Sequence, residues 1–128
     1  MKQDNIILDK SFSFAVRIVK LYKYLCDKKK EYVLSKQLLR SGTSVGACNP
    51  AGTRTNINEA QAGQIKADFI AKMAIASKEA RESKYWIDLL IKTDYLNIND
   101  EYTQSLLKDI EEIIKLLTSI AKTSQGNK

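Results

Sequence analysis

The densest group of side chains that could do chemistry lies between Lys78 and Lys84. It contains Glu79 and Glu82, which are three residues apart and flank Arg81. Residues three apart share one face of a helix, and paired glutamates on bundle helices can hold metal ions. The di-iron arrangement, however, uses Glu-x-x-His, and the chain has no histidine. We therefore expect no metal centre and no cofactor at this cluster.

The absence of histidine also excludes several common classes of catalytic site. Without them the chain lacks the commonest general base and any Ser-His or Cys-His nucleophilic pair. Its two cysteines, Cys26 and Cys48, fit no zinc-ligand spacing. The start of the chain, from Met1 to Lys10, has no continuous apolar stretch of the kind found in signal peptides. We expect a cytoplasmic protein with free thiols and no catalytic residue.

The glutamates have a structural interpretation as well as a catalytic one. Their charges complement that of an arginine on an earlier helical segment. We expect a structural polar network that fixes the register of neighbouring helices, made of Arg40, Glu59, Glu79 and Glu82. On this interpretation the cluster stabilises the fold and has no chemical role.

Gly42 and Gly46 form a second unusual motif, because two glycines four residues apart weaken a helix by about 1 kcal/mol each relative to alanine. Glycines in such a run could cradle a phosphate, but the Gly-Lys-Ser/Thr ending of a phosphate loop is absent. The pair instead favours close approach by a neighbouring helix.

Positive charge is concentrated in the first three-quarters of the chain. The net charge is +6, with 17 Lys and Arg against 9 Asp and Glu in residues 1–92. Such a field favours a polyanionic partner, although lysine runs on helices are often simply solvated. The expected phosphate contacts are Arg17, Lys20, Lys23, Lys28, Lys29, Lys30, Lys36 and Arg40. Contacts of this kind bind RNA or DNA without reading its sequence strongly.

Four long helical segments must position these residues. With one proline and five glycines the chain has few helix breakers, and apolar residues recur at helical spacing over about 11–29, 33–62, 64–93 and 99–122. Asp9 or Ser11 is the expected cap of the first segment. The two clearest apolar seams are Phe69, Met73, Ala76, Ala80, Ser83, Ile87 and Leu90, and then Leu106, Ile110, Ile113, Leu117 and Ile120. The pattern predicts an all-α, antiparallel up-and-down four-helix bundle, one domain over residues 1–128.

One stretch interrupts the second segment. Residues 48–55 contain the only proline, Pro50, followed two residues later by Gly52, which is typical of a loop. Residues 56–62 again have a helical pattern. We expect one long helix over 33–62 with a looped-out insert at about 48–55. The alternative is an ordinary helix end, in which the later residues only connect to the next helix.

Four stretches resemble a known bacterial family. They are Tyr32–Ala47, Asn56–Ala60, Asp68–Lys72 and Lys78–Trp86. They are similar to the four-helix-bundle proteins encoded in intervening sequences of 23S ribosomal RNA genes, whose fold is shared by accessory proteins of diversity-generating retroelements. The resemblance covers about residues 10–122. In that family Gly-Ala is followed directly by Asn-Ile-x-Glu-Ala, whereas residues 48–55 separate the two here.

The resemblance implies a basic bundle that assembles into a closed homo-oligomeric ring, commonly a pentamer, with no known enzymatic activity. Together with the charge pattern, it predicts a non-enzymatic, self-assembling scaffold that binds nucleic acid and needs no membrane. The alternative is a protein–protein interaction module with no direct nucleic-acid role. A pulldown with and without nuclease distinguishes the two functions.

Overall fold

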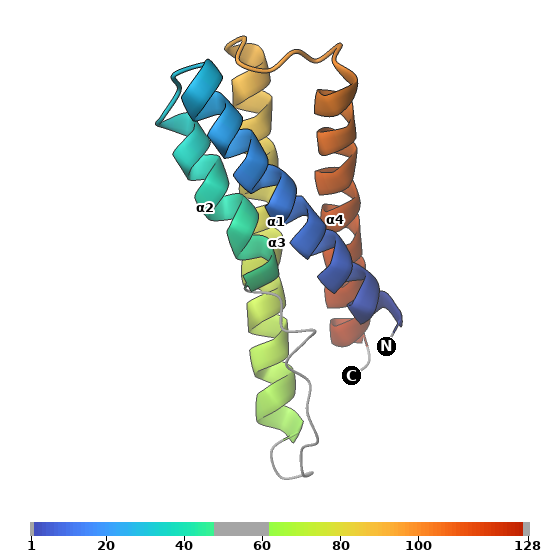
Figure 1. Cartoon of the computed structure of the whole chain (residues 1–128). Coiled ribbons are helices and arrows are strands. Elements are labelled where there is room, and N and C mark those ends of the chain that lie inside the picture. The colour runs from blue at the N-terminus through green and yellow to red at the C-terminus, as the bar shows by residue number, and fades with distance from the viewer. Residues whose placement is uncertain (1, 48–61, 127–128) are drawn as a thin grey trace.

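Four antiparallel helices make up the described part of the chain. The computed structural model describes residues 2–47 and 62–126, and the side chains of residues 6–47 and 66–123. The helices are α1 (Lys2–Lys28), α2 (Leu34–Ala47), α3 (Ala62–Lys92) and α4 (Glu101–Gly126). Each packs against the next in sequence, and α4 returns against α1 (Figure 1). The predicted all-α four-helix bundle is confirmed.

The core is formed by the seams that the sequence predicts for the last two helices. Every predicted seam residue of α3, from Phe69 to Leu90, is buried, and so is every one of α4, from Leu106 to Ile120. A repeat that alternates spacings of three and four keeps one stripe facing the bundle axis over the whole length of a helix. The apolar periodicity therefore selects the core-facing sides of these two helices.

The first helix begins much earlier than predicted. Ser11 does not cap it, because Ser11 lies in its interior, fully buried within a stripe that Ile7 opens and Phe14 continues. The serine occupies a core position because α2 comes close: a Cβ placed at Gly46 would lie 3.5 Å from the Ser11 Cβ. The expectation of a cap at Ser11 or Asp9 was wrong, since a small residue at a tight helix contact resembles a cap in sequence.

The remaining boundaries differ by smaller amounts. α3 begins at Ala62, and α4 continues to Gly126, beyond the predicted end at Lys122. No proline or glycine precedes Gly126 in this helix, so nothing in the sequence stops it earlier. The looped-out insert expected at 48–55 and the helical continuation expected over 56–61 lie outside the described residues, and Ala62, the last residue predicted for that helix, belongs to α3.

Close packing of α1 on α2 explains the glycine at position 42. A Cβ built there would lie 2.9 Å from Cγ1 and 3.0 Å from Cγ2 of the buried Ile18. Real Cβ atoms do not approach other carbons so closely, so only glycine fits this backbone. The packing interpretation is confirmed for Gly42, whereas at Gly46 an added Cβ would meet the Ser11 Cβ at an ordinary contact distance of 3.5 Å.

α1 and α4 are in contact over only part of their length. Two ion pairs join these helices, from Lys10 to Glu112 and from Arg17 to Asp109. Towards its C-terminal end, α1 diverges from α4 and follows α2 (Figure 1). The start of α1 and the end of α4 lie at one end of the bundle, and the α1–α2 connection lies at the opposite end.

Candidate nucleic-acid interface

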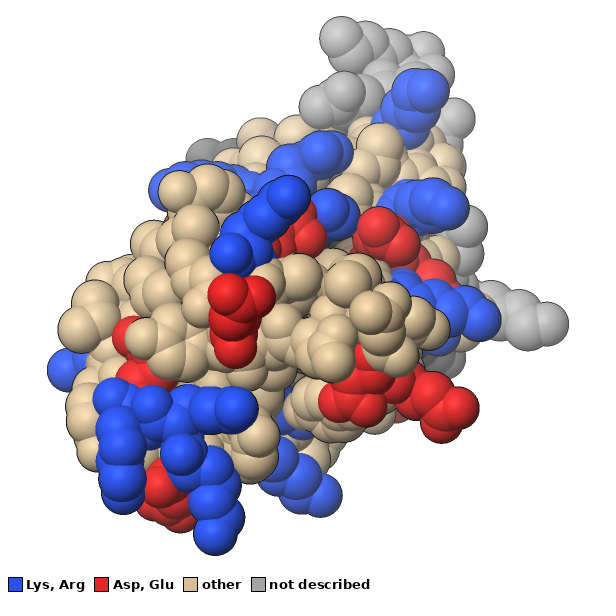
Figure 2. Space-filling model, turned by 90° about the horizontal axis from the view of Figure 1, so that it is seen from above, with Lys and Arg blue, Asp and Glu red and all other residues tan. Residues whose placement is uncertain are grey.

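Six of the eight predicted phosphate contacts gather where α1 ends and α2 begins. We call this group the basic end; its members are Lys20, Lys23, Lys28, Lys29, Lys30 and Lys36. All six side chains are exposed, and none forms a hydrogen bond or ion pair within the described part of the chain. Viewed from above, one group of Lys and Arg side chains gathers at the lower left, and others are interspersed with Asp and Glu over the rest of this face (Figure 2). The charge of the six lysines is therefore available to a partner.

A tight turn between the two helices brings these lysines together. Lys30 adopts a left-handed backbone conformation with a φ of 57°, and the Glu31 N–H donates to the Leu25 carbonyl at 3.0 Å. The Glu31 carboxylate then accepts hydrogen bonds from the backbone N–H groups of residues 33–35, at 2.7 to 3.1 Å. These N–H groups have no partner inside the helix, so Glu31 caps the start of α2.

The charged form of Glu31 is the one that the fold prefers. Burial by itself raises the pKa of this carboxyl, but hydrogen bonds from the backbone of Ser35, Leu34 and Val33 outweigh burial and lower the pKa below its ordinary value. The carboxylate therefore stays ionised at neutral pH. Its negative charge also lies at the positive end of the α2 dipole, where it is stabilising.

Arg17, in contrast, is engaged inside the bundle. Its guanidinium donates to the Asp109 carboxylate at 2.6 Å and to the Ser105 hydroxyl at 3.1 Å, and it lies over the Tyr102 ring, 4.9 Å from the centroid. Only 24% of its side-chain surface is exposed. The structure thus places Arg17 between α1 and α4, in an ion pair with Asp109.

Arg40 is likewise engaged, in the predicted polar network. Its guanidinium donates to Glu79 at 3.1 Å and also to Glu82. The indole N–H of Trp86 donates to the same Glu82 carboxylate at 3.0 Å. The structure therefore brings together three of the four expected members across α2 and α3; the fourth, Glu59, lies outside the described residues.

A buried serine pair extends this network, and we did not predict it. The Ser41 and Ser83 hydroxyl oxygens are 3.0 Å apart and fully buried, and Ser83 also donates to the Glu79 carbonyl at 2.9 Å. The feature of the sequence that could have predicted the pair is Ser83 itself, a polar residue in an otherwise apolar seam. A buried hydroxyl needs a partner, so its place in the seam indicates a second polar residue on the facing helix.

Aromatic rings accompany the exposed lysines. Tyr24 is 46% exposed and Tyr32 is 56% exposed, and both lie within the stretch that carries the basic end. Exposed tyrosines offer flat faces on which nucleic-acid bases can stack. This combination of unpaired cations and exposed rings is what a single-stranded nucleic acid needs from a protein surface.

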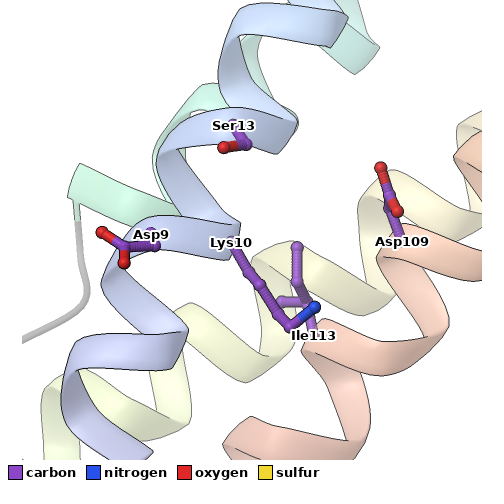
Figure 3. A pocket seen from close by; sticks show the side chains of 5 residues that line it. All are labelled: Asp9, Lys10, Ser13, Asp109 and Ile113. Atoms are coloured by element: carbon purple, nitrogen blue, oxygen red, sulfur yellow. The ribbon is translucent and has the colours of Figure 1, made fainter.

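A catalytic arrangement is not evident in the described residues. No group of three or more His, Cys, Asp or Glu is placed to hold a metal ion there. A small cavity of about 220 Å³ between α1 and α4 is lined by Asp9, Lys10, Ser13, Asp109 and Ile113 (Figure 3). The Asp9 side chain points away from Asp109, so these carboxylates do not form a catalytic pair.

The lysine of that cavity is already satisfied. Lys10 Nζ lies 2.8 Å from a Glu112 carboxylate oxygen. This hydrogen bond raises the pKa of Lys10 and lowers that of Glu112, so both groups stay charged and paired. The charged groups of this cavity therefore stabilise the contact between α1 and α4.

None of the described helices combines the length and the apolar character needed to cross a bilayer.

Comparisons with known proteins agree with this fold. Residues 3–119 match the family described as 23S rRNA-intervening sequence protein. A crystal structure from Bacteroides thetaiotaomicron, of a protein with unknown function from the S23 ribosomal protein family, is 49% identical. The match covers 94% of this chain and 98% of that one, with a TM-score of 0.80. None of the curated proteins matches. The chain belongs to the 23S rRNA-intervening sequence protein family.

Proposed function

We propose that this protein is a non-enzymatic, self-assembling helical scaffold whose basic end binds the phosphate backbone of RNA or DNA without strong sequence specificity. The observation that carries the proposal is the basic end itself: six exposed lysines without an internal partner at one end of the bundle. Unpaired cations at one place attract a polyanion and release its counterions on binding.

The free cations of the basic end are all lysines, which supports binding to nucleic acid with little dependence on base sequence. Both arginines of the predicted contact set, Arg17 and Arg40, form internal ion pairs. Arginine is the residue that most often reads guanine by a pair of hydrogen bonds, whereas lysine acts as a flexible point charge. A surface made of lysines therefore holds the backbone and leaves the bases largely unread.

Self-assembly is supported by an apolar stripe on the outer side of α1. Phe12 is 72% exposed, and Val16 and Val19 are also exposed, at the three- and four-residue spacing that places them on one helix face. A second copy of this chain is the partner that we propose for the stripe. In a closed ring, which the family resemblance suggests is a pentamer, the positive charge of each basic end is repeated around the assembly.

The test measures binding to an RNA duplex and a DNA duplex across a salt series. Three lysines of the basic end are replaced together, as Lys28→Ala, Lys30→Ala and Lys36→Ala. We expect weaker binding and a dependence of log K on log salt that is shallower by about one unit per lysine removed.

A variant with the same loss of charge serves as the control. Lys108, Lys115 and Lys122 are exposed on α4, away from the basic end, and are replaced by alanine together. This control should keep the wild-type salt dependence. If both triple variants weaken binding equally, the attraction comes from net charge alone and the proposed interface is wrong.

The competing function is a protein-interaction module. α3 exposes Ile75 and Tyr85 as well as its polar surface, so a protein partner could bind there. Partners that stay bound to the wild-type protein after nuclease treatment, together with no salt-dependent binding of nucleic acid, would favour this function over ours.

A further inference from the structure

A pocket of about 630 Å³ lies beside the basic end, where α1 has diverged from α4. It is bounded by the last half of α1, the connection between α3 and α4, and the first turn of α4. Leu21 and Leu96 give it an apolar floor. Its volume falls within the range of roughly 300–1,000 Å³ that small-molecule sites occupy.

Three tyrosines line this pocket. Tyr24 comes from α1, Tyr95 from the α3–α4 connection and Tyr102 from α4. Tyr24 and Tyr102 are the two exposed ones, at 46% and 39%. Arg17 lies over the Tyr102 ring and also donates to the Tyr102 carbonyl at 3.4 Å. This contact fixes the ring in place, so a stacking ligand does not have to order it.

The charged residues of the pocket include both signs. Lys20 and Lys29 belong to the basic end and also line the pocket, and Asp94 and Asp100 line it from the α3–α4 connection. None of these four forms an ion pair within the described part of the chain. A matching ligand therefore carries an anionic group, hydrogen-bond donors for the carboxylates and a flat ring.

A nucleotide has these three features. Its phosphate is the anion, its base is the flat ring, and its amino or ribose hydroxyl groups are donors that a carboxylate accepts. The groove between α3 and α4, which is about 500 Å³, is lined by residues such as Ile70, Met73 and Arg81, and none of the described residues that line it is aromatic. The pocket beside the basic end thus differs from that groove by offering stacking faces.

We propose that this pocket binds one unstacked nucleotide of a single strand, with its base against Tyr24 and Tyr102, its phosphate on Lys20 and Lys29, and its donor groups on Asp94 and Asp100. The proposal deepens the proposed function, because the lysines outside the pocket would hold the neighbouring phosphates. It adds a preference for single strands, since a base inside a duplex is not free to enter.

The first test compares Tyr24→Ala with Tyr24→Phe in binding to a labelled single strand of about 12 nucleotides, within the range of single-stranded site sizes. Loss of the ring should weaken this binding about 5- to 100-fold, and Tyr24→Phe should keep it. Tyr85→Ala, which removes an exposed ring on α3, is the matched control. Duplex binding should be the same in all three variants.

The second test uses free ligands and follows the ring signals of Tyr24 and Tyr102 by NMR. Guanosine monophosphate should shift both sets of signals, and inorganic phosphate alone should shift neither. Equal shifts from inorganic phosphate would mean that the lysines bind an anion without the base, and the nucleotide proposal would be overturned.

The outcomes separate the pocket from the proposed function. If nucleic acid binds with the expected salt dependence but Tyr24→Ala has no effect on single strands, the pocket proposal is overturned and the proposed function stands. If guanosine monophosphate binds the pocket but no RNA or DNA binds, the pocket takes a free nucleotide, and both the proposed function and the single-strand assignment of the pocket are wrong. If neither binds, both are wrong.

Discussion

At the scale of single residues, the two glycines of α2 differ in what a methyl group would meet. At Gly42 the methyl would collide with the branched side chain of Ile18, which is buried and has one preferred rotamer in a helix. At Gly46 the nearest atom, the Ser11 Cβ, is at an ordinary contact distance of 3.5 Å. Alanine should therefore destabilise the protein at position 42 but not at position 46.

We expect Gly42→Ala to destabilise the bundle. Overpacking costs about 1–3 kcal/mol, which exceeds the roughly 1 kcal/mol that alanine contributes through helix propensity. Gly46→Ala should leave stability unchanged or raise it by up to about 1 kcal/mol. Urea unfolding monitored by circular dichroism measures both. Equal stability of the two variants would show that α1 moves away from α2 without cost.

We expect the stability of the bundle to depend on pH through Glu31. Because its pKa is lowered in the folded state, its contribution is present above the unfolded glutamate pKa of about 4.3 and is lost as the pH falls through the lower folded value. We expect Glu31→Gln to cost about 1 kcal/mol at neutral pH, a typical value for a helix cap. The difference from the wild type should shrink below about pH 4.

Thermal unfolding of both proteins across the acidic range checks this expectation. Glu111→Gln is the control, since Glu111 is exposed on α4 and its loss should change stability by less than about 0.5 kcal/mol. A deficit of Glu31→Gln that stays constant down to the lowest pH would show that the carboxylate charge contributes nothing to the cap.

At the scale of helices, the α2–α3 contact depends on a polar network. Removing Arg40 leaves Glu79, whose side chain is 9% exposed, without its cation. We expect Arg40→Ala to cost about 1–3 kcal/mol. Arg81→Ala provides the control, because Arg81 is exposed and makes only a long 3.4 Å hydrogen bond to Thr118. Chemical denaturation of Arg40→Ala, of Glu79→Gln and of the double variant measures the coupling between the two residues.

The result that would contradict this expectation is additivity. If the double variant loses as much stability as the two single variants together, Arg40 and Glu79 are not coupled. The network would then be a surface arrangement with no part in fixing helix register.

Periodicity in the sequence was sufficient to predict the helices and most of their core faces. The seams of α3 and α4 depend only on a local repeat, and a repeat is visible without a structure. Ser11 shows where this approach fails, because a serine has the same residue type whether it caps a helix or packs against Gly46 on another helix. The basic end was predictable from lysine positions, whereas the engagement of Arg17 was not, since Asp109 and Tyr102 are distant in sequence.

The pocket beside the basic end depends on the angle between α1 and α4, which no pattern of residues in the sequence predicts. It lies where α1 diverges from α4 (Figure 1), between the C-terminal part of α1 and the α3–α4 connection. Helix crossing angles follow from the packing of whole surfaces. Tyr24 was therefore visible in the sequence as an aromatic residue near lysines, but Tyr102 was not visible as its neighbour.

At the scale of the whole molecule, the proposed assembly predicts a change in mass. Phe12→Asp places a charge on the exposed stripe of α1 without touching the core, since Phe12 is 72% exposed. We expect the oligomer to dissociate to monomers that remain helical. Sedimentation equilibrium and circular dichroism measure mass and helix content in the same samples.

Ile75→Asp is the matched control, because Ile75 is an exposed apolar residue on α3 and lies off the stripe. It should leave the mass unchanged. If Ile75→Asp dissociates the oligomer and Phe12→Asp does not, the subunit contact is on α3 and the assignment to α1 is wrong.

The positions of the helix ends have a practical consequence. α1 begins and α4 ends at the same end of the bundle, and the α1–α2 connection with its lysines lies at the other. A tag or surface tether added before α1 or after α4 would therefore be attached far from the basic end. Protein immobilised in this way would present its lysines and the adjacent pocket to the solution, so sensor measurements of ligand capture could be made without the attachment chemistry blocking the surface under study.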